Sequence, residues 1–339
     1  MSSNTVIVVG AGVIGASIAY HLASQGAEVL LVDAALPGFG ATRHSFGWIG
    51  RSPGDVSPAG ELRALGRLHW ERLRKEVPEL DVHWCGAVVW GEFFSGDDAV
   101  LSDDAAVREP NLVSPPSRSE FRSDDGWLDA TSATESLIRA AQQAGAKVRL
   151  GTPVTRLVRV DDGTVVGVML GSETLTASTV VVAAGTGSTA LCASAGFVLP
   201  MVSSPSVMVR LQAPVGIVTG IVANDRFEAR QSRDGMVLMP VDHDGESSMA
   251  ALMRIGEAAQ RLFVESFTGA AQTRLVGVDI GWRPMLADGD PSVGYTGVPG
   301  LYVAVAHPGV TLASVIGDAV ADEILTHETR AELALFQPR

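Results

Sequence analysis

Residues 5–33 read TVIVVGAGVIGASIAYHLASQGAEVLLVD and decide the fold. Residues 6–9 are consecutive β-branched apolar residues, which is typical of a strand covered on both faces in a parallel sheet. We expect a helix over residues 13–25 and a second strand over residues 28–32. Three glycines between the first strand and the helix have the GxGxxG spacing: Gly10, Gly12 and Gly15. This order of elements predicts a Rossmann-like α/β domain.

The glycine loop predicts a dinucleotide site. Gly10 permits a tight turn, Gly12 lets the backbone approach a pyrophosphate, and Gly15 lets the helix pack closely on the strand. Val13 and Ile14 open the helix, where unpaired N–H groups and the positive end of the dipole attract phosphate. We expect all five residues to form the pyrophosphate site.

Asp33 lies at the carboxyl end of the second predicted strand. A carboxylate at this position can accept hydrogen bonds from a ribose diol, and it argues against the 2′-phosphate of NADP. A glycine-rich turn in an ordinary α/β core is the alternative, but the complete order from strand to acid favours a dinucleotide. An NAD-dependent dehydrogenase would share this stretch.

Length, charge and cysteine content narrow the class of protein. A chain of 339 residues predicts two domains or one composite domain, and the net charge of -13 argues against a nucleic-acid partner. No apolar stretch is long enough to span a bilayer. Cys85 and Cys192 are isolated, so we expect no disulfide and no metal site, and a cytoplasmic location.

Residues 37–50, PGFGATRHSFGWIG, form a predicted loop directly after Asp33. The part GATRHSFG resembles the loop after the second strand in FAD-dependent amino-acid and amine oxidoreductases of the D-amino-acid oxidase, glycine oxidase and sarcosine oxidase superfamily. The resemblance implies that FAD is the cofactor and that this loop runs along its pyrophosphate toward the flavin ring. The implied contacts are Ala41, Thr42, Arg43, His44, Ser45 and Gly47.

A second block of resemblance follows a predicted helix over residues 131–144, with Thr131 or Ser132 as its N-cap. The strands expected next flank the turn at residues 161–163 as a hairpin and end with a buried strand over residues 179–184. In the family this pattern returns the chain to the nucleotide domain. The resemblance implies that Val154 contacts the adenine side and that Ala184 and Gly185 pass near the cofactor.

The third block covers residues 279–325. Its first part, DIGWRPMLADGD, resembles the family segment GxRPxxxDGxPxxG. Its second part predicts a strand, a loop from His307 to Gly309 and a helix from about Thr311. The resemblance places backbone N–H groups of this turn beside the flavin pyrimidine carbonyl, where negative charge grows on reduction. The implied contacts are Gly309, Val310, Thr311 and Leu312.

The remaining segments predict a second domain. Residues 201–274 alternate short apolar runs with turns, which favours a mainly antiparallel sheet, with one helix over residues 251–267. A further helix is expected over residues 61–77. The fold class is therefore α/β, a Rossmann-like FAD-binding domain with a mainly antiparallel β substrate domain. We assign the discontinuous FAD-binding domain to residues 1–80, 128–200 and 278–339, and the substrate domain to residues 81–127 and 201–277.

The resemblance implies two residues for the reaction. Arg283 stands at the family position that binds a substrate carboxylate, and its planar guanidinium suits two parallel hydrogen bonds. Its alternative role is to tie the two domains together through an internal Asp. His307 opens the loop before the last helix and either approaches the substrate or only positions the loop.

His44 raises the question of a covalent flavin. Thr42, His44 and Gly47 reproduce the T-x-H-x-x-G pattern of the dimethylglycine dehydrogenase branch, in which the matching histidine is attached to the flavin. That branch has aromatic and small residues where this chain has Arg43 and Phe46. Noncovalent FAD is the favoured hypothesis, and Arg43 is expected either at the pyrophosphate or in solvent.

The implied reaction is oxidation of an amino acid or N-substituted amino acid with a carboxylate, by hydride transfer to the flavin, giving an imine. No lysine follows Lys147, so the lysine-assisted reaction with oxygen of monomeric sarcosine oxidases is absent. The electron acceptor is dioxygen or a quinone or other electron-transfer partner. The alternatives are a flavin-dependent hydroxy-acid dehydrogenase and a non-catalytic or partner-dependent flavoprotein subunit.

Overall fold

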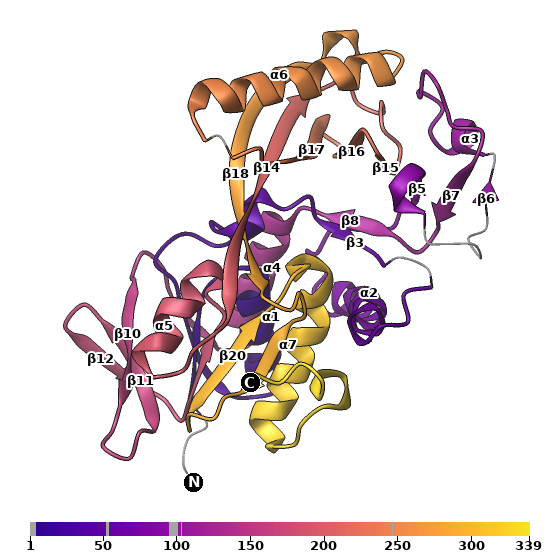
Figure 1. Cartoon of the computed structure of the whole chain (residues 1–339). Helices are drawn as coiled ribbons and strands as arrows, with labels where there is room; N and C mark the ends of the chain where they lie inside the picture. The colour runs from indigo at the N-terminus through magenta and orange to yellow at the C-terminus, as the bar shows by residue number, and fades with distance from the viewer. Residues whose placement is uncertain (1–4, 52–53, 95–100, 103, 246) are drawn as a thin grey trace.

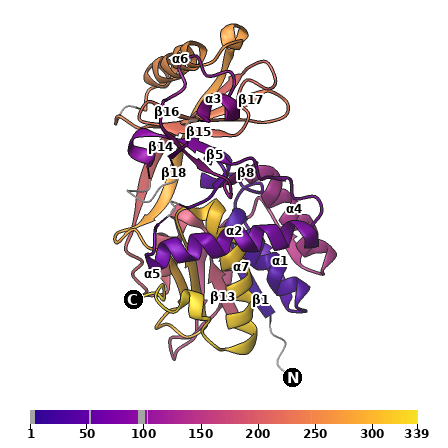
Figure 2. The same ribbon diagram turned by 90° about the vertical axis from the view of Figure 1, so that its right-hand side faces the viewer.

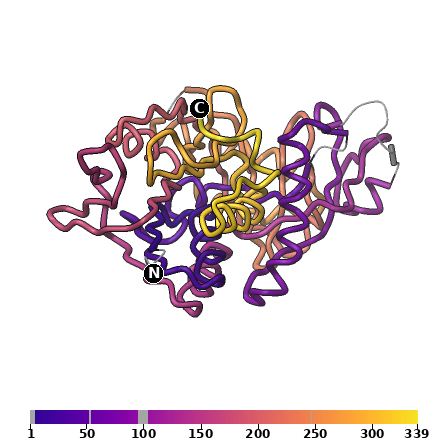
Figure 3. The backbone as a smooth tube through the Cα atoms, turned by 90° about the horizontal axis from the view of Figure 1, so that it is seen from below, coloured from indigo at the N-terminus to yellow at the C-terminus, as the bar shows by residue number. Residues whose placement is uncertain are grey.

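The computed structural model describes residues 5–51, 54–94, 101–102, 104–245 and 247–339. The first lobe is built on a six-stranded sheet in which all neighbours are parallel except the edge pair β19 and β20. In spatial order the strands are β19 (Ser292–Tyr295), β20 (Leu301–Val305), β13 (Thr179–Val182), β1 (Thr5–Val9), β2 (Glu28–Val32) and β9 (Lys147–Arg149). Figure 3 shows the C-terminal segment (yellow) close to the N-terminal segment (indigo), and in the sheet only β13 separates β20 from β1. The predicted Rossmann-like sheet is confirmed.

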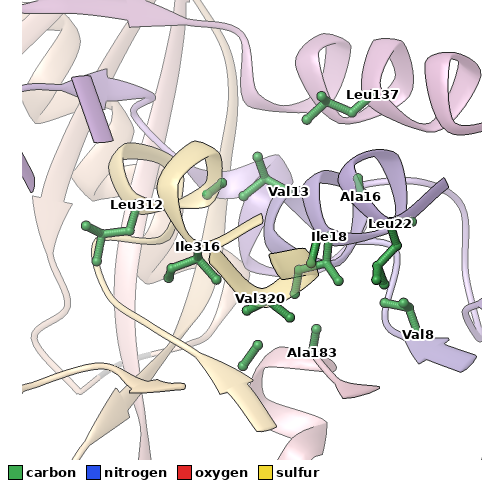
Figure 4. Packing of buried hydrophobic residues seen from close by; sticks show 14 of the residues in the cluster. Val8, Val13, Ala16, Ile18, Leu22, Leu137, Ala183, Leu312, Ile316 and Val320 are labelled. Atoms are coloured by element: carbon green, nitrogen blue, oxygen red, sulfur yellow. The ribbon is translucent and has the colours of Figure 1, made fainter. Parts of the chain in front are cut away.

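Helices cover this sheet and enclose the largest apolar core. The helices are α1 (Val13–Ser24), α2 (Pro58–Glu76), α4 (Ala130–Gln143) and α7 (Gly309–Thr326). α1 packs against both α4 and α7, and Figure 4 shows Ile18 and Val320 within the apolar layer that α1 and α7 share. Burial of this layer stabilises the lobe through removal of apolar surface from water.

α2 crosses α7 on the outside of the lobe (Figure 2). A buried hydrogen bond fixes the crossing, because the Trp70 indole N–H donates to the Val310 carbonyl oxygen at 2.9 Å. Ser314 Oγ also donates to the Gly66 carbonyl oxygen at 2.8 Å. Two hydrogen bonds with α2 therefore hold the first two turns of α7 in place.

The second lobe is an eight-stranded, mainly antiparallel sheet; only β5 and β15 pair in parallel. In spatial order the strands are β18 (Arg274–Leu286), β14 (Met201–Gln212), β17 (Met236–Asp242), β16 (Phe227–Gln231), β15 (Ile221–Asn224), β5 (Ala87–Val89), β7 (Ser119–Arg122) and β6 (Leu101–Ser102). Helix α6 (Met249–Ser266) covers one face of this sheet (Figure 1). Val207 and Val209 of β14 belong to the apolar core between the sheet and α6. The predicted antiparallel second sheet is confirmed.

β14 and β18 form a long ribbon that links the two lobes (Figure 1). The ribbon pairs Ser204 with Arg283 near one end and Val209 with Val278 near the α6 end. Residue 278, where the predicted substrate domain gives way to the FAD-binding domain, falls inside this continuous strand. Residues 95–100, within the predicted range 81–127, lie outside the described residues.

Smaller elements complete the two lobes. The predicted hairpin of β10 (Val154–Arg159) and β11 (Val165–Leu170) is present and gains a third strand, β12 (Glu173–Thr176). A small three-stranded sheet joins β3 (Trp48–Ile49), β8 (Gly126–Leu128) and β4 (Val82–His83). The remaining helices are α3 (Ala105–Arg108) and α5 (Ser188–Ser194).

Four predicted helix starts were late by one to three residues; among them, α2 begins at Pro58 rather than at residue 61, and α6 begins at Met249 rather than at residue 251. α4 is capped by Asp129, whose Oδ1 accepts from the backbone N–H of Ser132 at 2.7 Å, and not by Thr131 or Ser132. α7 begins at Gly309, two residues before the predicted Thr311. In each case several neighbouring residues are of a type that can begin a helix, and only the path of the backbone in three dimensions selects one of them.

Candidate active site

A cavity of about 940 Å³ lies between the two large sheets, at the carboxyl ends of β1, β2, β13 and β20. Its volume is at the upper end for ligand sites, and its place is where open α/β sheets bind nucleotides. Most predicted site residues line it: Gly10, Gly12, Val13, Ile14, Asp33, Ala41, Thr42, His44, Ser45, Gly47, Val154, Ala184, Gly185, Arg283, His307, Gly309, Val310 and Thr311. Gly15, Arg43 and Leu312 do not line it.

The glycine loop approaches its neighbours as closely as the sequence predicts. Gly10 has φ +114°, and a Cβ there would lie 2.3 Å from the Ala183 carbonyl oxygen. A Cβ on Gly15 would lie 1.9 Å from the Gly10 carbonyl oxygen, so Gly15 serves the packing of α1 on β1 rather than the cavity. Gly12 caps α1 without a side chain, and no acidic residue lies in the first turn. The helix N-terminus therefore presents N–H groups to the cavity, which suits a pyrophosphate.

Asp33 closes the far side of this loop. Its Oδ2 accepts a hydrogen bond from the backbone N–H of Ala11 at 2.6 Å, and its Oδ1 accepts from that of Ala35 at 2.7 Å. Each carboxylate oxygen has a second lone pair, so the half-buried Asp33 can still accept from the two hydroxyls of a ribose.

The loop after Asp33 turns through a short 3-10 helix, Ala41–His44. The buried Thr42 ties it to α1, because its Oγ1 accepts from the backbone N–H of Val13 at 3.2 Å. Arg43 instead is exposed, with its guanidinium 5.5 Å from the centre of the Phe39 ring. Arg43 was expected either at the pyrophosphate or in solvent, and in the structure its side chain lies in solvent.

His44 faces the cavity, and its Nδ1 is buried with no hydrogen-bond partner among the described residues. Burial lowers the pKa of His44, and the nearby Arg210 guanidinium lowers it further. The ring is therefore neutral at pH 7. An orphaned polar atom at the wall of this cavity is expected where a polar cofactor completes the site.

Arg283 reaches the cavity from the ribbon strand β18. Its Nη2 donates to Ser204 Oγ at 2.8 Å, while its Nε is buried without a partner. Within the described part of the chain, no carboxylate lies within ion-pair distance of it. Arg283 thus presents to the cavity a positive charge that no carboxylate of the described residues neutralises, the arrangement that binds a carboxylate.

His307 lies at the start of the loop before α7. Burial lowers the pKa of His307 to about 4, with smaller contributions from the positive charges of Arg283 and Arg63. Its imidazole is neutral near pH 7, so it can donate or accept one hydrogen bond without adding charge.

Comparison with known proteins decides the family, because the profile described as "FAD dependent oxidoreductase" matches residues 5–323. The chain belongs to this family. It is 27% identical to glycine oxidase from Geobacillus kaustophilus, over 98% of this chain and 95% of that protein. It is 28% identical to 4-methylaminobutanoate oxidase (formaldehyde-forming) from Paenarthrobacter nicotinovorans, over 60% of this chain but 27% of that protein.

The structure agrees with this family. The crystal structure of glycine oxidase from Geobacillus kaustophilus matches with a TM-score of 0.85 and 24% identity, covering 98% of each chain. The cofactor of an FAD-dependent oxidoreductase is FAD, and the cavity fits it on three grounds. The helix N-terminus suits the pyrophosphate, Asp33 suits the ribose, and the orphaned His44 Nδ1 marks a wall that protein groups leave incomplete.

Several cavity residues were not predicted from the sequence. Glu228 of β16 and Met208 of β14 face the cavity because strand alternation points them away from α6. Asp125 also lines it; burial raises the pKa of Asp125 to about 7, although its Oδ2 accepts from the Trp48 indole N–H at 2.8 Å. Arg51 and Arg63 add positive charge to the wall. For Glu228 and Met208 the only signal in the sequence is the alternation of side chains along a strand, and alternation does not say which face of the sheet lines a ligand site.

Among the described residues, no three His, Cys, Asp or Glu side chains are arranged to hold a metal ion. The described residues also contain no helix with the length and apolar character needed to cross a membrane.

Proposed function

We propose that this FAD-dependent oxidoreductase oxidises an amino acid or N-substituted amino acid at the carbon bearing the nitrogen. The observation that carries the proposal is the partly unpaired Arg283 guanidinium in the same cavity as the glycine loop. FAD, when bound, accepts the hydride from that carbon. The substrate nitrogen also loses a proton, so the product is an imine, which water hydrolyses.

In this proposal, Arg283 binds the substrate carboxylate through two parallel N–H donors. Ser204 accepts a hydrogen bond from Nη2 and restricts the rotation of the guanidinium. A carboxylate held in this way fixes the position of the neighbouring carbon, and fixed orientation lowers the barrier without any further catalytic group. His307 contributes a neutral polar surface beside the reacting carbon.

The two relatives named above support a carboxylated amine as substrate, because glycine and 4-methylaminobutanoate each combine a carboxylate with an amine. The assignment of domains and of individual site residues stays a proposal. A cytoplasmic location is also a proposal, and the free thiols Cys85 and Cys192 favour it.

We propose that the reduced enzyme passes its electrons to the acceptor without the help of a lysine. Lys75 and Lys147 are the only lysines of the chain, and both are exposed and outside the cavity. Reoxidation of the reduced enzyme in air should be compared with reoxidation by a quinone. Faster reoxidation by the quinone assigns a dehydrogenase, and faster reoxidation in air assigns an oxidase.

The substrate class is tested by adding L-, D- and N-methyl amino acids, and hydroxy acids, to the holoenzyme without oxygen. Loss of the visible flavin band with an amino acid supports the proposal. Loss of the band with hydroxy acids alone would instead assign a hydroxy-acid dehydrogenase. No response to either class would favour a partner-dependent flavoprotein subunit.

A further inference from the structure

Glu228 is a carboxylate in the cavity that the proposed reaction does not use. It lies on β16, whose partner strand β17 pairs Leu238 with Arg230. This register places Glu228 opposite Pro240, and Pro240 pairs with Met208 of β14. All three line the cavity, so they form one row across the sheet on the face that points away from α6.

Within the described part of the chain, no cation lies within ion-pair distance of Glu228. Among the described residues it has no hydrogen-bond or ion-pair partner. The nearest candidate on its own strand, Arg230, points elsewhere: its guanidinium lies 4.2 Å from the centre of the Trp127 ring, and its Nε donates to the Phe46 carbonyl oxygen. Burial, and to a smaller extent the charges of Asp242 and Glu92, raise the pKa of Glu228 to about 7, although the charge of Arg283 lowers it. A half-buried carboxylate without a partner is costly unless a ligand pairs with it.

The cavity therefore has opposite charges at two places. Glu228 and Arg283 lie on strands separated by β17 and β14, which is three strand spacings or roughly 14 Å across the sheet. The row that contains Glu228 meets β18 at Asp279, so Arg283 also lies four residues, roughly 13 Å, farther along that strand. Both residues line the cavity, and the charge of Arg283 lowers the pKa of Glu228. A ligand with a carboxylate at one end and a cation at the other would satisfy both.

Aromatic rings add to the case for a cation. Phe46, Trp48 and Phe93 line the same cavity. The ring centres of Phe46 and Trp48 are 6.2 Å apart, and Trp48 stacks on Phe93 at 6.4 Å. Phe93 follows Glu92, whose charge acts on Glu228. A carboxylate with aromatic faces nearby is the combination that recognises alkylated ammonium groups.

The nitrogen that binds Glu228 differs from the nitrogen that is oxidised. Hydride loss from the carbon needs a neutral amine with a free lone pair, whereas a carboxylate partner stabilises the protonated, positively charged form. Resting on the function proposed above, we infer that Glu228 binds a second, positively charged nitrogen of the substrate. The substrate is then a carboxylated amine that carries an additional cationic nitrogen away from its carboxylate.

The test uses pairs of ligands that cannot be oxidised and differ only in charge. Trimethylammonio carboxylates of two to five carbons are each compared with the isostere in which carbon replaces the charged nitrogen, for example 4-trimethylammoniobutanoate with 5,5-dimethylhexanoate. Binding to the holoenzyme is followed by the change in the flavin spectrum at about pH 8. We expect the charged member of at least one pair to bind on the order of tenfold more tightly.

Variants assign that preference to Glu228. Glu228→Gln keeps the shape but removes the charge, and it should abolish the preference while leaving the binding of the neutral isosteres within about twofold. Glu257→Gln removes an equal charge at an exposed position of α6 outside the cavity and should keep the preference. Equal binding of both members of every pair by the wild type, or an undiminished preference in Glu228→Gln, would overturn the inference.

Oxidation assays separate this inference from the proposed function. If neutral amino acids reduce the flavin as well as cationic ones, and Glu228→Gln behaves like the wild type, the role of Glu228 fails and the amine oxidation stands. If no amino acid reduces the flavin but the charge preference is present and depends on Glu228, the proposed reaction fails while the cation site stands.

Discussion

Asp33 Oδ2 accepts a hydrogen bond from the backbone N–H of Ala11, with 2.6 Å between the two atoms. This bond joins the end of β2 to the glycine loop after β1. One carboxylate thereby shapes the loop that faces the pyrophosphate and stands where the ribose is expected. Cofactor binding and loop geometry consequently depend on the same side chain.

Replacing Asp33 tests this dual role. Asp33→Ala removes the acceptor for Ala11 and Ala35 and for the ribose hydroxyls, and we expect FAD to bind on the order of 10- to 100-fold more weakly. The measurement is the ratio of flavin to protein after purification, followed by titration of the apoprotein with FAD. Glu257→Ala, at an exposed site on α6, is the control. An Asp33→Ala protein that purifies fully loaded would contradict the ribose contact.

Arg283 should control the affinity for carboxylated substrates. Arg283→Ala removes the positive charge and its hydrogen bonds, and we expect the apparent KM to rise on the order of 10- to 100-fold. Ser204→Ala keeps the guanidinium but frees it from its anchor at 2.8 Å, so its effect should be smaller. Steady-state kinetics on the same substrate compare the two. An unchanged KM in Arg283→Ala would remove the assigned role.

Acid precipitation of the holoenzyme tests how FAD is held. Because Arg43 and Phe46 depart from the residues of the covalent branch, we expect all of the yellow colour in the supernatant. His44 nevertheless has a neutral ring and an unpaired Nδ1 at the cavity wall. Colour that stays with the pellet, and that moves to the supernatant in His44→Ala, would establish a covalent bond to His44 instead.

His307 should make the protein sensitive to acid. The unfolded chain binds a proton at this residue near pH 6.5, whereas the folded protein does so near pH 4. The free energy of unfolding therefore decreases as the pH falls through this window, by at most about 3 kcal/mol. In His307→Asn this decrease should be smaller, as measured by urea denaturation of the holoenzyme between pH 7 and pH 4. His327→Asn, at an exposed histidine, should behave like the wild type; equal losses in all three proteins would sink the prediction.

The nucleotide half of the site was predictable because its signals are contiguous. Gly10, Gly12 and Asp33 lie within one run of 29 residues. The backbone conformation of Gly10 demands glycine, a side chain on Gly12 would crowd Thr42, and Asp33 accepts hydrogen bonds from the backbone. Gly15 belongs to the same pattern but acts through the packing of α1 on β1. Leu312 was expected at the flavin, yet its side chain is buried in the core of the first lobe, and its N–H already donates to the Pro308 carbonyl oxygen at 3.2 Å.

The substrate half depended on information that is absent from local sequence. Glu228 and Met208 meet at the cavity only because β16, β17 and β14 pair in one register. A shift of one residue would turn both toward α6. Arg283 was found through a resemblance to the family segment, whereas the unpartnered state of its Nε became visible only in three dimensions.

The chain binds FAD, and we propose that it uses FAD to oxidise a carboxylated amine. The most direct test is the visible spectrum of the purified protein, recorded without oxygen before and after addition of L-, D- and N-methyl amino acids. We predict a flavin band that one class of these compounds bleaches. A protein without flavin would contradict the binding of FAD, and a flavin band that no amino acid alters would contradict the oxidation of a carboxylated amine.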